Sequence, residues 1–161
     1  MNDRPMRLQL VRLLEGDDAH MRFEEAVADF PESAINAFPP NVPYTPWQLL
    51  EHLRLTQRDL LDYVLDPAYL EPEWPAAYWP AREATANAAE FAASVAAFLA
   101  DRDVLRDLLT DPTTQLFAPM PRAPAHSIAR EIRIAGDHCA YHVGEFAVLR
   151  QVMGTWPADH R

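Results

Sequence analysis

The sequence predicts an all-α fold, a four-helix bundle formed by a single domain over residues 1–161. Only four residues are glycine, whereas fifteen are proline. The prolines gather at 39–46, 67–80 and 112–124, and the stretches between them are rich in Ala, Leu, Glu and Arg, which favour helices. Because proline is excluded from helix interiors, these three proline-rich segments divide the chain into four helices.

The composition excludes several classes of protein. No run of about 18 apolar residues occurs, so we expect no membrane-spanning helix. The N-terminal residues lack the apolar core of a signal peptide, and a single cysteine leaves no intrachain disulfide, so we expect a cytoplasmic protein. The net charge of −10 offers no basic stripe for phosphates, which excludes nucleic acid as a partner. If the protein is an enzyme, we expect its substrate to be a small molecule.

The first helix is expected over about 5–29. Its apolar residues recur at helical spacing: Leu10, Leu13, Phe23 and Val27. His20 falls on the same face, and we expect a partly buried, hydrogen-bonded side chain there.

The second helix is expected over about 45–65. Thr45 is a favourable N-cap, and Pro46 suits the first helical position. The apolar face contains Leu49, Leu53, Leu60 and Val64. His52 lies on this face, where a lone histidine is by default a core residue.

Residues 66–81 are too rich in proline to form a helix. The segment is also too long for a hairpin between neighbouring helices, which usually takes about 2–8 residues. Extended, about 15 residues reach roughly 50 Å, enough to pass along a 20-residue helix of about 30 Å. It therefore predicts a crossover that makes the second and third helices parallel. The third helix, over about 82–109, contains no histidine and is expected to have a packing role.

The fourth helix, over about 127–153, carries His138 and His142. Positions i and i+4 lie on one face of a helix, so two imidazoles at this spacing can bind one metal ion. The alternative is two histidines that pack or are solvated independently.

His52 falls at a compatible depth if the second and fourth helices are antiparallel. It lies about 7 residues, or roughly 10 Å, from one helix start, and His138 and His142 lie roughly 16–23 Å from the other helix end. Three neutral nitrogen ligands with an open position are typical of catalytic metal sites. Imidazole suits Zn, Ni, Cu and Fe, so the ligands do not identify the metal.

Three segments carry a resemblance to a known family. Residues 43–53, Pro-Tyr-Thr-Pro-Trp-Gln-Leu-Leu-Glu-His-Leu, contain His52. Residues 137–144 contain Asp-His-x-x-Tyr-His-x-Gly, and residues 73–80 contain Glu-Trp-Pro and Tyr-Trp-Pro. In their order along the chain, the segments resemble the DinB-like (DinB/YfiT) superfamily, and the resemblance extends over essentially the whole chain.

The resemblance implies a four-helix bundle of up-down-down-up topology, which in this superfamily often forms a homodimer. It implies that His52, His138 and His142 bind a divalent metal ion, most often zinc or nickel. Characterised members include transferases that use the low-molecular-weight thiols bacillithiol or mycothiol, and a mycothiol-dependent maleylpyruvate isomerase.

Glu145 departs from the family pattern, because members often have glutamine at this position. It lies three residues after His142 on the same helical face. We consider it as the candidate catalytic residue, acting as a general base, and alternatively as a hydrogen-bond acceptor for a ligand histidine or an interface residue.

Two functions follow as hypotheses. The first is a divalent-metal-dependent enzyme, a transferase or hydrolase, with thiol transfer to a small electrophile as the favoured reaction. Its pocket mouth, where a thiol cofactor would bind, is expected at Trp74, Tyr78 and Trp79. The second is a non-catalytic metal-binding module in stress response or protein interaction. An open metal position would favour the enzyme, and a sealed one the module.

Overall fold

The computed structural model describes residues 3–160 and is helical. Within these residues no β-strand is formed, which confirms the all-α prediction. The helices are α1 (Arg4–Glu15), α2 (Phe23–Val27), α3 (Pro46–Leu65), α4 (Ala88–Thr110) and α5 (Ile128–Met153), with two 3-10 turns, η1 (Glu32–Ala34) and η2 (Ala76–Tyr78).

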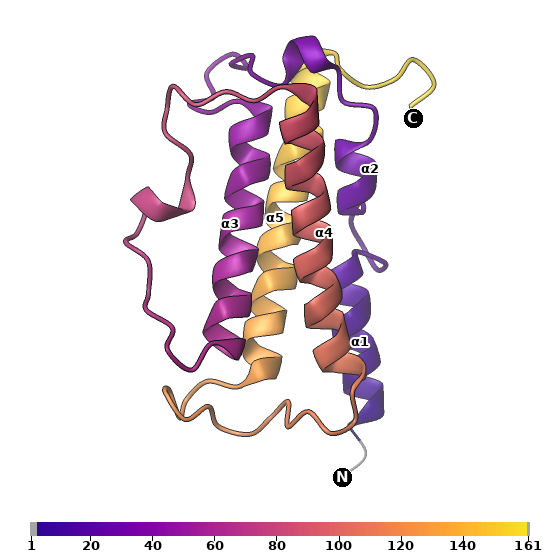
Figure 1. The fold of residues 1–161 in the computed structure, drawn as a ribbon. Coiled ribbons are helices and arrows are strands. Elements are labelled where there is room, and N and C mark those ends of the chain that lie inside the picture. Colours follow the sequence, from indigo (N-terminus) through magenta and orange to yellow (C-terminus); the bar gives the residue numbers. More distant parts are fainter. Residues whose placement is uncertain (1–2, 161) are drawn as a thin grey trace.

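The long helices form one bundle (Figure 1). α1 and α2 lead from the lower end of the bundle to the upper end, and α3 and α4 both run back down. α5 then returns to the upper end, beside α3 and α1. Residues 66–87, here named the crossover, pass outside α3 from its lower end to the start of α4, as Figure 1 shows.

The prediction of one continuous helix over about 5–29 is wrong, because the structure has two helices there. α1 ends at Glu15 because Gly16 adopts a left-handed conformation with φ of 77°, and the Asp17 amide donates back to the Arg12 carbonyl at 3.0 Å. Glycine adopts this conformation without a steric penalty and commonly ends helices. The chain resumes as the short α2, which ends before residue 29.

The third predicted helix, over about 82–109, begins later than expected. Asn87 caps α4, since its side chain accepts from the Glu90 amide at 3.0 Å and its own amide donates to the Glu90 carboxylate at 2.7 Å. The preceding residues are held in a non-helical conformation by side chains of other segments. The Asn36 side chain pairs with both backbone groups of Ala86, at 2.8 and 3.0 Å. These tertiary contacts outweigh the helix preference of the alanines around them.

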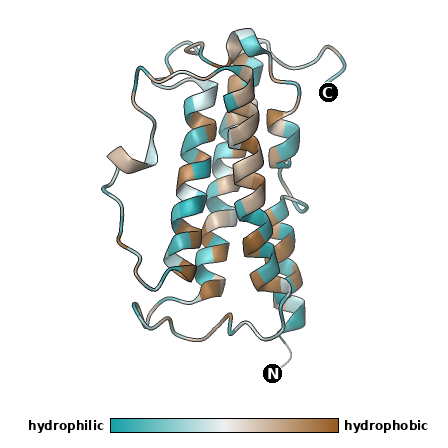
Figure 2. Ribbon diagram, in the orientation of Figure 1, coloured by the Kyte–Doolittle hydropathy of each residue, from teal (hydrophilic) through white to brown (hydrophobic). Residues whose placement is uncertain are grey.

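The core consists of two apolar clusters stacked along the bundle axis. The lower cluster joins α1, α3, α4 and α5 through Leu10, Leu14, Leu61, Leu105, Leu109 and Ile132. The upper cluster joins α2, α3, α4 and α5 and includes Phe23, Leu49, Leu53, Phe98, Val143 and Phe146. Apolar and polar residues alternate around the helices (Figure 2). None of the described helices has the length and apolar character needed to cross a membrane.

Two glycines of α5 give opposite expected effects on stability. A Cβ atom at Gly136 would lie 2.7 Å from Cγ of Leu13, where α1 approaches α5, whereas at Gly144 it would meet open space. Gly136→Ala is expected to destabilise the fold by about 1–3 kcal/mol through overpacking. Gly144→Ala is expected to stabilise it by about 0.5–1 kcal/mol by favouring the helix. Urea unfolding of both variants tests this pair, and effects of the same sign would contradict the α1–α5 packing.

Candidate metal centre

Three histidines from two helices meet on the side of the bundle that the crossover covers. The ring of His52, on α3, lies 5.1 Å from that of His138 and 4.8 Å from that of His142, both on α5. The two α5 rings are 4.4 Å apart. One nitrogen of each residue lies within 4.8 Å of the others. Among residues 3–160, this is the one group of three histidine, cysteine or acidic side chains close enough to hold a metal ion.

The position of His52 follows from the way α3 begins. Thr45 and Gln48 form a reciprocal capping box, with hydrogen bonds of 3.2 and 3.0 Å, that fixes the first turn of the helix. His52 follows one turn later and is 3% exposed. Its ring stacks on that of Trp79 at 4.0 Å and 5°, and its Nδ1 lies 2.8 Å from the Tyr78 carbonyl oxygen. A carbonyl only accepts, so Nδ1 carries the proton and Nε2 carries the lone pair.

The hydrogen bonds of Thr56 identify the tautomer of His138 in a similar way. Its hydroxyl donates to the His52 carbonyl oxygen at 2.8 Å, the i−4 acceptor of the same helix. The hydroxyl oxygen is then an acceptor for His138, whose Nδ1 lies 3.3 Å away. His138 Nδ1 is therefore the donor, and its Nε2 keeps the lone pair.

Glu145 contacts the third histidine directly. His142 Nδ1 donates to Glu145 Oε2 at 2.7 Å within α5. Burial raises the pKa of the Glu145 carboxyl above its usual value. Of the three roles considered for Glu145, the geometry matches the hydrogen-bond acceptor that orients a histidine, and His142 is likewise left with its lone pair on Nε2.

The three side chains fit a divalent metal ion. Each Nδ1 is engaged by an oxygen acceptor, and among the described residues no hydrogen bond to any of the three Nε2 atoms is seen. Two Zn–N bonds of about 2.0–2.1 Å at the tetrahedral angle separate their nitrogens by roughly 3.4 Å. One nitrogen of each histidine already lies within 4.8 Å of the others, so side-chain rotations would bring three donors to that separation. Histidine ligands in proteins characteristically donate their second N–H to such acceptors.

Burial keeps these imidazoles neutral. Desolvation, and then the neighbouring His52, lowers the pKa of His138 to about 4. Desolvation, followed by His138 and His52, lowers the pKa of His142 to about 3. The pKa of His52 is lowered by burial as well. A neutral imidazole is the form that binds metal, so the site needs no deprotonation near pH 7.

The metal-free protein is expected to lose stability as the pH falls from about 6.5 towards 4. In this range an unfolded histidine binds a proton, while His138 and His142 in the folded state do not. Stability falls on acidification wherever the unfolded state binds more protons. Urea unfolding at pH 7, 6 and 5 measures the effect, with a His138→Gln, His142→Gln double variant as control. An equal pH dependence in both proteins would contradict the lowered pKa values of His138 and His142.

The three aromatic residues expected at the pocket mouth have different positions. Trp79 lies on the site, where its ring stacks on that of His52 at 4.0 Å and on that of Tyr44 at 5.1 Å. Tyr78 reaches the site through its carbonyl group and directs its ring elsewhere. Trp74 is 67% exposed, and the ring contact described for it is with Tyr78 at 5.2 Å. Of the three, Trp79 is thus the residue whose side chain covers a histidine.

Two further residues complete the surroundings. Cys139 is buried, and desolvation raises the pKa of its thiol to about 12, so it remains an apolar packing residue. Tyr141 is 71% exposed and meets the His142 ring edge-on at 4.8 Å. Together with the partly exposed His138, it marks the side on which the site approaches solvent.

Sequence reasoning missed Thr56 and the Tyr78 carbonyl as partners of the histidines. Thr56 had a usable signal, because it lies four residues after His52 and so faces the same side of α3. The Tyr78 carbonyl had none, since any residue of the crossover supplies the same group.

The comparisons with known proteins agree with the geometry. A family model described as the DinB superfamily matches residues 15–146, which include all three histidines. The comparisons with curated proteins and with solved structures gave no match. The family match spans most of the chain, and the chain therefore belongs to the DinB superfamily.

Proposed function

We propose that this protein binds one divalent metal ion, zinc or nickel, through the Nε2 atoms of His52, His138 and His142. The observation that carries the proposal is the common state of the three imidazoles. Each Nδ1–H donates to an oxygen, and the lone pair of each ring is therefore on Nε2. Three different acceptors thus leave all three histidines with a free lone pair on Nε2. Three histidines that packed independently would not need to share this tautomer.

We further propose that the protein is a metal-dependent enzyme acting on a small molecule, with transfer of a low-molecular-weight thiol as the favoured reaction. A divalent ion held by three neutral ligands keeps its full charge and supplies Lewis-acid activation of water or a thiol. Glu145 orients His142, and Trp79 shields His52 from water. The thiol reaction is supported by the family resemblance of the sequence, and the side near His138 and Tyr141 gives a substrate its approach.

A non-catalytic metal-binding module is the second candidate, and burial favours it. His52 is 3% and His142 is 8% exposed, and the crossover lies over His52. A site shielded on this scale suits a stable resident ion.

One experiment separates the two candidates. Protein loaded with one equivalent of zinc or nickel is incubated with bacillithiol, mycothiol or cysteine and a panel of small electrophiles, and thiol consumption is measured. The enzyme predicts metal-dependent consumption that is absent in His142→Ala. Stoichiometric metal binding without consumption of any thiol would favour the module and contradict the transferase.

A further inference from the structure

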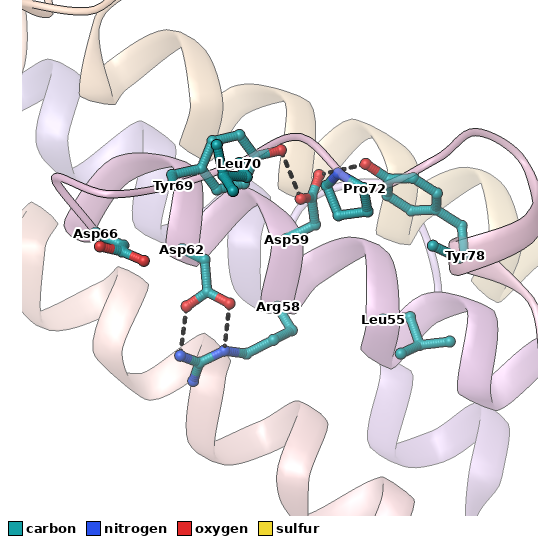
Figure 3. Close-up of a pocket in the computed structure, with 10 residues that line it drawn as sticks. Leu55, Arg58, Asp59, Asp62, Asp66, Tyr69, Leu70, Pro72 and Tyr78 are labelled. Carbon is teal, nitrogen blue, oxygen red and sulfur yellow. Dashed lines mark hydrogen bonds and ion pairs between the residues drawn. The ribbon is translucent and has the colours of Figure 1, made fainter.

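A carboxylate on α3 holds the crossover where it passes the metal centre. Asp59 accepts hydrogen bonds from two tyrosines of the crossover, Tyr69 at Oδ1 (2.7 Å) and Tyr78 at Oδ2 (2.9 Å). Figure 3 shows the carboxylate between the two hydroxyl groups, on the wall of a cavity of about 250 Å³. The neighbouring Arg58 pairs with Asp62 instead, so both oxygens of Asp59 are left to the tyrosines.

Tyr78 connects this carboxylate to a metal-site histidine. Its hydroxyl donates to Asp59, and its carbonyl oxygen accepts from Nδ1 of His52 at 2.8 Å. The next residue, Trp79, stacks on the same imidazole. The position of this short stretch therefore determines both contacts that the crossover makes with His52.

The crossover has little apolar burial of its own to hold it there. Of residues 66–87, Tyr78 and Ala86 are the two buried apolar residues. Polar side chains of other segments fix the chain on both sides of the Tyr78 carbonyl. Asp59 holds the side chains of Tyr69 and of Tyr78 itself. After Tyr78, the Gln48 side chain donates to the Arg82 carbonyl at 2.9 Å. Backbone held mainly by such bonds responds strongly to the loss of one of them.

The two tyrosine hydroxyl groups at this contact stay protonated near neutral pH. Burial, followed by the hydrogen bond to Asp59, raises the pKa of Tyr78 to about 12. The same two causes raise the pKa of Tyr69. Both hydroxyl groups therefore remain neutral donors, and hydrogen bonds to a carboxylate are stronger than those between neutral groups.

We propose that Asp59 is a positioning residue of the metal centre, acting through Tyr78 to hold His52 with its Nε2 directed at His138 and His142. The inference rests on the proposed metal-binding function. Its action is indirect, because Asp59 itself touches neither the imidazoles nor the ion. Tyr69 shares the carboxylate but has no contact with His52 in the described structure, and it therefore provides a matched control.

The test compares Tyr78→Phe and Asp59→Asn with Tyr69→Phe, each of which removes or weakens a hydrogen bond at the same carboxylate. Cobalt(II) affinity and the visible spectrum of the cobalt-loaded protein are measured for each. In the metal-free proteins, ¹⁵N NMR of the histidine rings reports the His52 tautomer, with the His52 signal assigned by its loss in His52→Gln. Urea unfolding shows whether each variant is folded.

Tyr78→Phe and Asp59→Asn are expected to weaken cobalt binding roughly tenfold. This is the lower end of the roughly 10–100-fold loss that follows removal of an outer hydrogen-bond partner. They are also expected to change the cobalt spectrum and mix the two tautomers of His52. Tyr69→Phe should lose similar stability and keep the wild-type affinity, spectrum and tautomer. If all three variants lose stability but keep the wild-type affinity, spectrum and tautomer, Asp59 has a merely structural role. The inference is then wrong, while metal binding stands. A wild-type protein that binds no cobalt would instead overturn the proposed function, and with it the inference.

Discussion

Replacement of Arg150 by alanine is expected to destabilise the protein by about 3–5 kcal/mol, which combines lost packing with unpaired buried carbonyl groups. Arg150 lies in the last turn of α5 and is 0% exposed. Its guanidinium donates to the carbonyl oxygens of Ala26 (3.0 Å), Ala28 (2.6 Å) and Thr155 (2.8 Å). It also lies over the Trp156 ring at 4.1 Å.

The size of the effect follows from what these contacts connect. Ala26 and Ala28 stand at the end of the short α2, and Thr155 follows the end of α5. One planar group with five donors thus joins two segments far apart in the sequence. Alanine would leave three carbonyl groups without these donors and a cavity beside Phe30 and Trp156.

Urea and thermal unfolding measure the loss, which corresponds to a fall in Tm of roughly 10 °C for a chain of this size. Arg133→Ala is the matched control, because Arg133 is an exposed arginine of the same helix. Its effect should stay within about 0.5 kcal/mol. A change of less than about 1 kcal/mol for Arg150→Ala would contradict the structural role assigned to its guanidinium.

Substitution of His142 by alanine is expected to remove stoichiometric metal binding. Loss of an outer hydrogen-bond partner weakens metal affinity roughly 10–100-fold, and loss of one of three ligands should exceed that. The metal-free fold should persist, because the variant removes a buried polar ring and leaves both core clusters intact.

Elemental analysis after dialysis against one equivalent of zinc measures the effect, with unfolding curves as the test of the fold. His160→Ala is the control, since His160 is exposed and stacks on Trp156 far along the chain from the site. Undiminished zinc in folded His142→Ala protein would show that the ion binds elsewhere.

The main features of the fold could be predicted because proline and capping residues act locally. The Thr45 cap and the three proline-rich segments separate the long helices without any tertiary information. The break after Glu15 and the late start of α4 could not be predicted in the same way. Gly16 is one flexible residue within a sustained helical pattern, and residues before Asn87 are held by the distant Asn36.

The candidate metal centre could be predicted in part. The spacing of His138 and His142 and the depth of His52 depend on helix geometry, which is regular. The tautomers depend on Thr56, Glu145 and a backbone carbonyl of the crossover. The first two lie at helical spacing from a histidine, but the carbonyl is placed by an irregular segment whose path depends on Asp59 and Gln48.

X-ray absorption spectroscopy of the zinc-loaded protein tests the central claim most directly, because it counts the atoms bound to the ion. We expect one zinc ion per chain with three imidazole nitrogens at about 2.0–2.1 Å and no sulfur at about 2.3 Å. Zinc bound by sulfur, zinc bound by fewer than three imidazoles, or a folded protein that retains no zinc would contradict it.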